Sequence, residues 1–377
     1  MADLTDDDLR AGVAAGVIDE AAAARLTALA QGRRSAAANT ARDDEPFEFF
    51  RGFGEIFIAV GLCMAFGAFN VLARLIGGLS FAVIGRPGDD ALSDGSLIAA
   101  LTPYVLSAAA AWLLSYYFAR RRRMSLPSIV LALAFTFACI SIGGHFGDYL
   151  VLWAGEAIVV VAGAAAGVIA MAAYYLVFRL PFALAPLGAS LLAMVVVGAQ
   201  IAVGSPIDGD LSFPEAVFDL AQAPAIAIAV LLCGLALFAA AIRFDMRDPH
   251  RLNRFSAAAF WLHVVAAPAI VNTICLSLFN LGGVIGYLAA AAAFLLVSLV
   301  AIAIDRRSFL MAGVVYAGLA LAAAVRAATG ESFETGALTI LLLGVLIAAL
   351  GAQWTAARGR LMRALPDFPG KGRLPPY

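Results

Sequence analysis

The residues best suited to chemistry lie together in one long apolar stretch, near residues 256–279. His263 and Asn272 have polar side chains, and Pro268 removes a backbone hydrogen bond from a helix and frees a carbonyl. Inside a membrane such residues either bond one helix to another or form polar points on a translocation path. At about 100° per residue, the spacing of His263 and Asn272 directs them to opposite faces of a helix, which argues against one continuous polar stripe. We single out all three as candidate binding residues.

A second candidate group is His145, Asp148 and Glu156, which lie in the sequence GGHFGDYLVLWAGE. The sequence places these residues in or beside an outer loop between two spans, in which the glycines can shape a re-entrant turn. Two carboxylates and an imidazole can bind a cation or pass protons if they converge, whereas an ordinary solvated loop would leave them in water. Their spacing does not by itself define a metal site, and we predict no bound metal.

The chain lacks the common signatures of membrane enzymes and ATP-driven pumps. It contains no Walker A sequence, no HExxH and no GxSxG. Its four cysteines form no CxxC pair and lie in apolar runs, so we expect small core residues at Cys63, Cys139, Cys233 and Cys275. We therefore assign no catalytic residue, expect no cofactor, and expect that the protein is not an enzyme.

Composition indicates which elements must position these side chains. The chain has 377 residues, of which 63% are hydrophobic and 14% charged, and its mean hydropathy is +0.93. Soluble domains are about 45–50% apolar and about 25% charged, so the excess apolar surface predicts contact with a lipid bilayer. A membrane helix needs about 20 mainly apolar residues. The sequence predicts an all-α, polytopic transmembrane helix bundle of about ten spans, near residues 54–74, 97–118, 126–143, 156–178, 181–203, 223–242, 256–279, 282–304, 309–326 and 336–355.

Arginines test this span count, because cytoplasmic segments of membrane proteins tend to carry positive charge. With the N-terminus in the cytoplasm, the arginine-rich segments all fall on the cytoplasmic side, at 120–123, 179, 243–254, 306–307 and 358–373. The opposite loops are mainly acidic. This alternation predicts a multi-pass protein of the bacterial inner membrane with both termini in the cytoplasm. The net charge of −1 gives no indication of a nucleic-acid partner.

The chain divides into three parts. Residues 1–45 predict a small cytoplasmic helical hairpin and linker, in which Asp19 caps the second helix. This part is too short to bury a large core and is a candidate site for a protein partner. Residues 46–357 form the bundle, in which residues 75–85 either extend the first span or lie along the outer interface. Residues 358–377 form a basic cytoplasmic tail whose first arginines are expected to meet anionic lipid: Arg358, Arg360 and Arg363.

Two stretches carry a resemblance to other proteins, LRAGVAAGVIDEAAAARLTAL (9–29) and FFRGFGEIFIAVGL (49–62). The chain resembles uncharacterised bacterial membrane proteins of a family with a domain of unknown function, in which a short N-terminal helical hairpin precedes about eight to ten spans. The resemblance implies the same plan for the whole chain. It implies no activity and no functional residues.

Two classes of function stay open. The leading class is transport of a small solute or ion, which is supported by the number of spans and by His263, Pro268 and Asn272. The alternative is a non-transporting membrane scaffold, assembly factor or sensor that uses the N-terminal hairpin for interaction.

Overall fold

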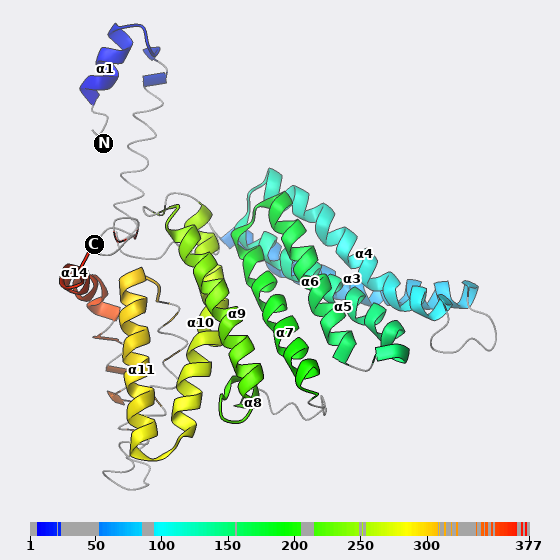
Figure 1. The fold of residues 1–377 in the computed structure, drawn as a ribbon. Helices are drawn as coiled ribbons and strands as arrows, with labels where there is room; N and C mark the ends of the chain where they lie inside the picture. Colours follow the sequence, from blue (N-terminus) through cyan, green and yellow to red (C-terminus); the bar gives the residue numbers. More distant parts are fainter. Residues whose placement is uncertain are drawn as a thin grey trace. The chain divides into compact units, whose positions relative to one another are not determined.

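A computed structural model gives the fold of the chain (Figure 1). It describes residues 6–20, 22–23, 53–84, 94–154, 157–204, 215–248, 251, 254–307 and 351–367, with isolated positions between 309 and 349 and at 371 and 374. The chain divides into two units, Met1–Phe47 and Glu48–Tyr377.

The first unit contains a short helix and a turn. Helix α1 covers Asp6–Ala14, and the turn after it contains Gly16 at φ 68°, a left-handed conformation that glycine adopts at no steric cost. The carboxylate of Asp19 accepts a hydrogen bond from the backbone N–H of Ala22, at 2.5 Å. This is the bond expected of Asp19 as an N-cap, while the second helix itself stays a prediction, because most of it lies outside the described residues.

Among the residues that the structure describes, eight helices of the second unit are long and apolar enough to cross a membrane. At about 1.5 Å per residue, each can cross a hydrocarbon core of about 30 Å. They are α3 (Phe53–Ile84), α4 (Asp94–Ser115), α5 (Ser125–Ala154), α6 (Ala157–Phe178), α7 (Leu184–Val203), α9 (Pro224–Asp245), α10 (Arg254–Asn280) and α11 (Gly283–Ile304). Short elements connect some of them: the π-helix η1 (Tyr116–Arg121), the 3-10 helix η2 (Pro181–Ala183) and α8 (Glu215–Phe218).

The predicted all-α membrane fold is confirmed, and the chain is a multi-pass membrane protein. The first eight predicted spans coincide with these eight helices. The last two predicted spans, near 309–326 and 336–355, lie largely outside the described residues. Helix α3 continues to Ile84, which decides the status of residues 75–84 in favour of a longer first helix.

The turn predicted around His145 is wrong, because α5 continues as a helix to Ala154. A Cβ atom at Gly143 would lie 2.5 Å from the carbonyl oxygen of Ala162 in α6. Gly147, one turn further along α5, is equally close to the backbone of α6, where its Cβ atom would lie 2.7 Å from a Cα atom. The glycines that indicate a turn in the sequence are therefore contact residues that let two helices approach closely.

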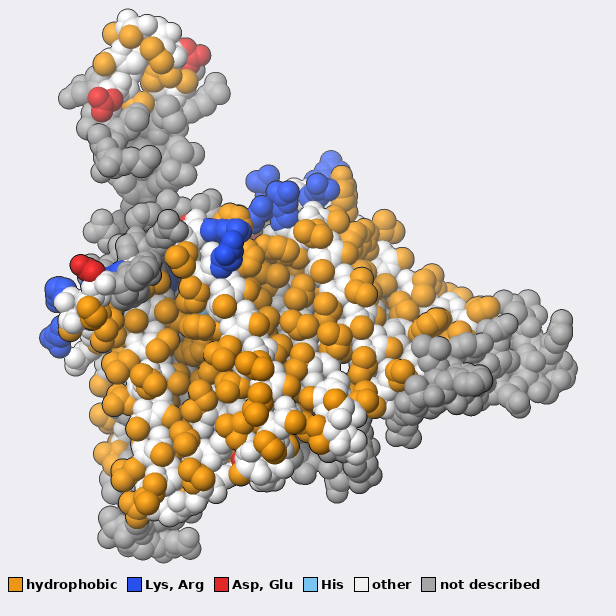
Figure 2. All heavy atoms as spheres, in the orientation of Figure 1, with side chains coloured by type: hydrophobic (Ala, Val, Ile, Leu, Met, Phe, Trp, Pro, Cys, Tyr) orange, Lys and Arg blue, Asp and Glu red, His pale blue; other side chains and the backbone are white. Residues whose placement is uncertain are grey.

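Arginine side chains gather at one end of the bundle, which we call the basic end (Figure 2). It contains the turns that follow α4, α6, α9 and α11. Each of these turns has a residue other than glycine in the left-handed conformation, with φ between 53° and 58°: Arg123, Arg179, Arg251 and Asp305. Hydrophobic side chains cover the flanks of the helices in the same view, as expected for surfaces that meet lipid (Figure 2).

The helices form two halves, α3 to α7 and α9 to α11, which are joined where α7 packs against α9 and α10 (Figure 1). The first half contains an aromatic core of Trp112, Phe135, Tyr174 and Phe178. The ring centroids of Tyr174 and Phe178 are 4.5 Å apart, and those of Trp112 and Phe178 are 4.9 Å apart. The Tyr174 hydroxyl donates a hydrogen bond to the hydroxyl oxygen of Ser115 at 2.8 Å, so this buried phenol is satisfied.

The second half is built around α10. In α10, 56% of the membrane-crossing window is buried, against 39% or less in the other seven described spans, which makes α10 the central helix. A further helix, α14 (Trp354–Ala364), packs one face on this half, because Trp354, Arg358 and Met362 recur at every fourth position and are all buried. The expectation that Arg358 meets anionic lipid is therefore wrong, since its side chain faces the protein.

Candidate functional site

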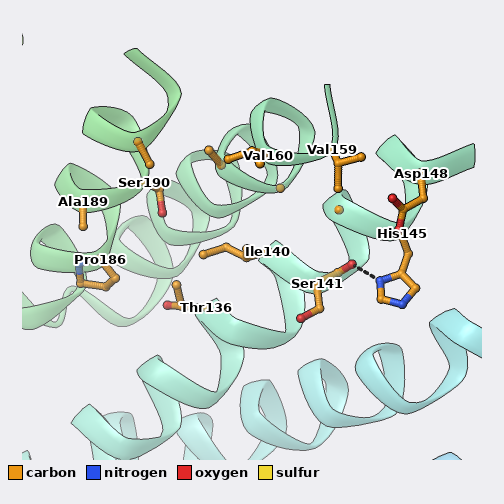
Figure 3. Close-up of a pocket in the computed structure, with 14 residues that line it drawn as sticks. Thr136, Ile140, Ser141, His145, Asp148, Val159, Val160, Pro186, Ala189 and Ser190 are labelled. Carbon is orange, nitrogen blue, oxygen red and sulfur yellow. Dashed lines mark hydrogen bonds between the residues drawn. The ribbon is translucent and has the colours of Figure 1, made fainter. Parts of the chain in front are cut away.

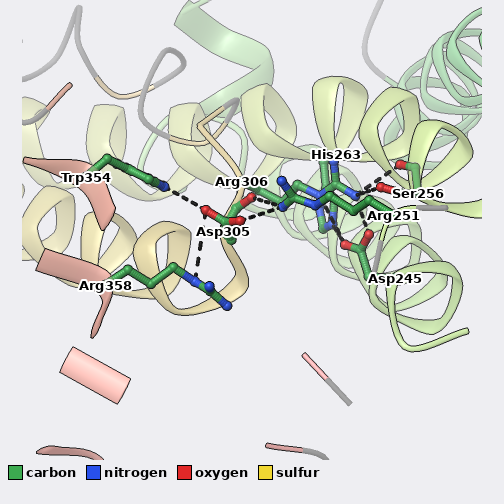
Figure 4. A network of polar contacts seen from close by, with 8 residues as sticks. All are labelled: Asp245, Arg251, Ser256, His263, Asp305, Arg306, Trp354 and Arg358. Atoms are coloured by element: carbon green, nitrogen blue, oxygen red, sulfur yellow. Dashed lines mark hydrogen bonds and ion pairs between the residues drawn. The ribbon is translucent and has the colours of Figure 1, made fainter. Parts of the chain in front are cut away.

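A cluster of ionisable side chains is buried near the basic end of the second half (Figure 4). Asp245 ends α9, His263 lies about two turns into α10, and Arg306 follows α11. Their exposed fractions are 3%, 0% and 0%. His263 Nε2 lies 3.0 Å from Asp245 Oδ2. Arg306 donates to both carboxylate oxygens, with Nε 3.2 Å from Oδ2 and Nη2 paired with Oδ1. We call Asp245, His263 and Arg306 the ionic cluster.

Local chain geometry brings Arg306 into this cluster. The residue before it, Asp305, has a left-handed backbone (φ 58°) that ends α11 and turns the chain back toward α10. Arg306 Nη2 also donates to the backbone oxygen of Ser256 at 3.0 Å and to its hydroxyl oxygen at 3.2 Å, in the first turn of α10. One guanidinium therefore connects α9, α10 and the end of α11, which its planar array of donors suits.

A second set of polar contacts surrounds Asp305 (Figure 4). Arg251 Nη2 lies 2.8 Å from Oδ2 of Asp305 and donates to its backbone oxygen at 2.7 Å. Trp354 Nε1 donates to Oδ1 at 2.6 Å, and Arg358 Nε lies 4.0 Å from the same oxygen. Because Trp354 and Arg358 belong to α14, these contacts attach α14 to the turn after α11. The side chain of Asp305 is 14% exposed, so this set lies closer to water than the ionic cluster.

His263 is the member of the ionic cluster that can change its charge in place. Asp245 is paired with the guanidinium of Arg306, which stays charged, so the carboxylate accepts and the imidazole Nε2–H donates. The other ring nitrogen, Nδ1, is buried without a hydrogen-bond partner in the described part of the chain. In this tautomer Nδ1 has the free lone pair, so it is the atom at which a proton would add. The rings of Phe238 and Phe309 enclose the imidazole at centroid distances of 5.4 and 5.6 Å.

A groove between α5, α6 and α7 contains two members of the second candidate group (Figure 3). Its volume is about 550 Å³. His145 and Asp148 lie at one end of it, and His145 Nδ1 is 2.9 Å from the backbone oxygen of Ser141. The rest of the lining is mainly apolar and includes Ile140, Val159, Val160, Pro186 and Ala189. Two of the three residues predicted from the sequence therefore line one groove. Asp148 is exposed there and forms no buried ion pair among the described residues.

The structure separates the other predicted candidates. Asn272 is half-buried further along α10, and Pro268 is exposed on it, so neither belongs to the ionic cluster with His263. Helix α10 runs through Pro268 without interruption. Glu156 lies outside the described residues, and its convergence with the other two members of its group stays a prediction.

Sequence reasoning missed two of the three cluster residues, Asp245 and Arg306. Both lie in segments that the charge alternation assigns to polar turns, where an arginine is expected to face water. One signal could have found Asp245. It lies at the C-terminal end of a helix, where the helix dipole disfavours a carboxylate, so it needs a nearby cation.

Asp219 forms a separate polar site outside the spans, at the end of α10 remote from the ionic cluster. Its carboxylate accepts hydrogen bonds from the backbone N–H of Ala221 at 2.8 Å, from Gln222 Nε2 at 3.0 Å and from Asn280 Nδ2 at 2.8 Å. Burial acts to raise the pKa of this carboxyl, but the hydrogen bonds outweigh it and hold the pKa below its ordinary value. These bonds fix the start of α9 to the end of α10.

The fold and these contacts define a multi-pass α-helical membrane protein with a buried ionic cluster. Comparisons of the chain with models of known protein families, with curated proteins and with solved structures find no match. Function is therefore inferred from the side chains themselves.

Proposed function

We propose that the protein moves a small solute or ion across the membrane, and that the ionic cluster couples this movement to protonation of His263. The observation that carries the proposal is a fully buried imidazole in a membrane-crossing helix, bonded to a carboxylate and with a second ring nitrogen available. Ionisable side chains inside spans are costly and commonly mark ion paths or proton relays. A buried ion pair adds little net stability compared with apolar packing, so stability alone is a weak reason for it.

Protonation of His263 would change the charge balance of the cluster. While His263 is neutral, the charges of Asp245 and Arg306 cancel. A proton on Nδ1 adds a positive charge between Phe238 and Phe309. The single carboxylate of Asp245 then has to neutralise both His263 and Arg306. The contact between α10 and the turn after α11 becomes less favourable, and a conformation in which these elements separate gains population. Such a change at one end of the bundle is the kind of motion that alternating access requires.

We also propose that the basic end faces the cytoplasm of a bacterial inner membrane, with both termini on that side. The arginines of this end support the orientation. A C-terminal green fluorescent protein fusion should fluoresce, because this reporter folds in the cytoplasm. Activity of alkaline phosphatase fused at the same position would contradict the orientation.

The transport proposal is tested with the full chain in proteoliposomes on a solid-supported membrane. Alkali cations, amino acids, sugars and carboxylates are applied between pH 5 and 8, and charge movement is recorded. We expect a current with one class of solute, and we expect it to lose its pH dependence in His263→Gln, which cannot take up a proton in this range. Ser298→Ala is the matched control, because the hydroxyl that it removes is also buried and, among the described residues, donates within α11 to the backbone oxygen of Phe294 at 2.8 Å. A current whose pH dependence is the same in His263→Gln and in the wild type would contradict the role of His263.

The alternative function is a membrane scaffold, assembly factor or sensor. The attachment of α14 to Asp305 through Trp354 and Arg358 favours it, because these contacts give the basic end a fixed amphipathic surface. A folded wild type that gives no current with any of these solutes would favour this class. The next experiment would then be capture of a partner by residues 1–45, with the bundle retained in the bait.

A further inference from the structure

A pocket of about 630 Å³ lies at the basic end, and its lining includes no residue of the ionic cluster. Three parts of the chain form it, namely the turn after α4, the end of α6 and the start of α10. Half of its lining is basic, with Arg120, Arg123, Arg179 and Arg254, and the other half is apolar, with Ala119, Leu176, Val177 and Phe178. No carboxylate lines it among the described residues. Four cations around one cavity repel one another unless an anion lies between them.

The four arginines have no carboxylate partner among the residues that the structure describes. Arg120 lies over the ring of Tyr116 and Arg254 over the ring of Phe255, each at 5.8 Å from the ring centroid. All four residues are exposed, so their guanidinium groups can reach a molecule that enters the pocket.

The backbone conformation of two of these arginines is a second observation that bears on why an arginine is present there. Arg123 and Arg179 have φ values of 53° and 54°, a left-handed conformation in which glycine is the usual residue after a helix. A side chain at such a position costs about 1 kcal/mol or more. Helix termination alone would favour glycine at both places. In the other two turns of this end the left-handed residues are Arg251 and Asp305, whose side chains form an ion pair, whereas Arg123 and Arg179 form no ion pair among the described residues.

Helix direction explains three of the arginines but not the fourth. Arg120, Arg123 and Arg179 lie at or beyond the C-terminal ends of helices, where the dipole favours a cation. Arg254 begins α10, where the dipole favours an anion instead. A positive side chain at a positive helix end is favourable when an anion is bound there, because both then attract it.

Aromatic contacts hold the walls of the pocket in place. Phe178, part of the lining, packs against Trp112 and Tyr174 in the aromatic core. Phe182 of η2 packs against Trp261 of α10 with ring centroids 4.7 Å apart, which fixes the end of α6 relative to the start of α10. These contacts hold the end of α6 and the start of α10, which carry Arg179 and Arg254, in a fixed relation.

We propose that this pocket binds the phosphate group of an anionic phospholipid at the membrane surface. Arginine guanidinium groups match the oxygens of a phosphate in a bidentate manner. The apolar part of the lining favours a lipid over a soluble anion, because Leu176 is 74% exposed and Val177 38% exposed beside the arginines. These side chains lie on α6, where an acyl chain could follow the helix away from the phosphate. Basic pockets between membrane helices are a known type of site for anionic headgroups.

The test compares lipid binding by the full chain and by two double variants. Native mass spectrometry in detergent measures the apparent affinity for dioleoylphosphatidylglycerol and, as a neutral comparison, for dioleoylphosphatidylcholine. Arg179→Gln/Arg254→Gln removes two charges from the pocket, and Arg243→Gln/Arg247→Gln removes two exposed charges at the end of α9, outside the pocket lining. We expect the pocket variant to bind the anionic lipid about tenfold or more weakly, with the α9 variant within about twofold of the wild type.

The outcomes separate the sources of phosphate and the effects of folding. Equal losses in both double variants would overturn the proposal, because total charge and not the pocket would then hold the lipid. Millimolar inorganic phosphate is added alone in a thermal-shift arm. The lipid assignment is overturned if inorganic phosphate raises the thermal midpoint of the wild type but not of Arg179→Gln/Arg254→Gln, while the anionic lipid does not raise the midpoint of the wild type. The site would then bind a soluble phosphate. Should the glutamine variant not fold, Arg179→Lys/Arg254→Lys keeps the charge and loses the bidentate geometry, and unchanged lipid affinity in it would count against the proposal.

Discussion

The two halves of the bundle hold their helices together in different ways. In the first half, glycines let the backbones of α5 and α6 come into contact. Tyr174 packs in the aromatic core and donates a hydrogen bond to Ser115. Its buried carboxylate, Glu55, accepts the backbone N–H of Leu126 at 3.3 Å, at the start of α5, where the helix dipole favours a negative charge. In the second half, by contrast, the ionic cluster is enclosed by apolar rings. Among the described residues, the helices of the first half pack without a buried ion pair, so packing of a membrane bundle does not by itself require the cluster.

The largest effect is expected from Asp245→Ala, which would leave the charge of Arg306 buried without its carboxylate. Breaking a buried pair from one side costs about 3–5 kcal/mol. The thermal midpoint of the purified protein in detergent should fall steeply. Asp148→Ala is the control, because this carboxylate is exposed on α5, and a surface change of this kind is within about 0.5 kcal/mol. Similar thermal midpoints for Asp245→Ala and Asp148→Ala would show that the buried ion pair of the second half does not matter more for stability than an exposed carboxylate of the first half.

An intermediate effect is expected from Gly143→Ala in the first half. The new Cβ atom would lie 2.5 Å from the carbonyl oxygen of Ala162, so α5 and α6 must separate. Overpacking of this kind costs about 1–3 kcal/mol. Gly198→Ala on α7 is the matched control, since no atom lies within 4 Å of its Cβ position. The control should be neutral or more stable by about 0.5–1 kcal/mol. Thermal midpoints in the same detergent give both values, and a control as unstable as Gly143→Ala would show that the helix contact is not what matters.

The smallest effect concerns pH and Asp219, a carboxylate of the second half that has hydrogen-bond donors in place of a cation. Because its folded pKa lies below the ordinary value of 3.8, its contribution to stability is present above pH 3.8 and is lost as the pH falls through the lower folded pKa. The difference in thermal midpoint between the wild type and Asp219→Asn should therefore be larger at pH 6 than at pH 3. A difference that does not change with pH would assign the acid sensitivity of this half to other carboxylates.

Sequence patterns predicted the helices of this protein better than the direction of its polar side chains. A run of apolar residues has to span the bilayer, so the eight described spans could be located from length and hydropathy. His263 was also identifiable, because a polar residue in the middle of such a run needs a partner. Its partners were not, since Asp245 and Arg306 lie at helix ends, where a charge can face either water or the bundle. Hydropathy does not distinguish these two directions, and only the packing of α9, α10 and α11 does.

The glycines of α5 are the second case in which local pattern was insufficient. Gly143 and Gly147 are compatible with a turn and with a close helix contact, and one sequence contains no information about which helix lies opposite. The arginines with a left-handed backbone conformation are a third case. Nothing in the types of Arg123 and Arg179 indicates a positive φ, because glycine is the residue that usually signals it.

The connectivity of the ionic cluster has a consequence for how the protein is made. Asp245 and Arg306 are 61 residues apart, and at about 5–20 residues per second a ribosome needs about 3–12 s to pass from one to the other. During that interval α9 has been synthesised, while the guanidinium that will neutralise its last residue has not. The carboxylate has to wait at the aqueous boundary or beside the insertion machinery until α11 is complete. A nascent chain that stops before Arg306 would therefore lack the guanidinium that pairs with Asp245 in the complete fold.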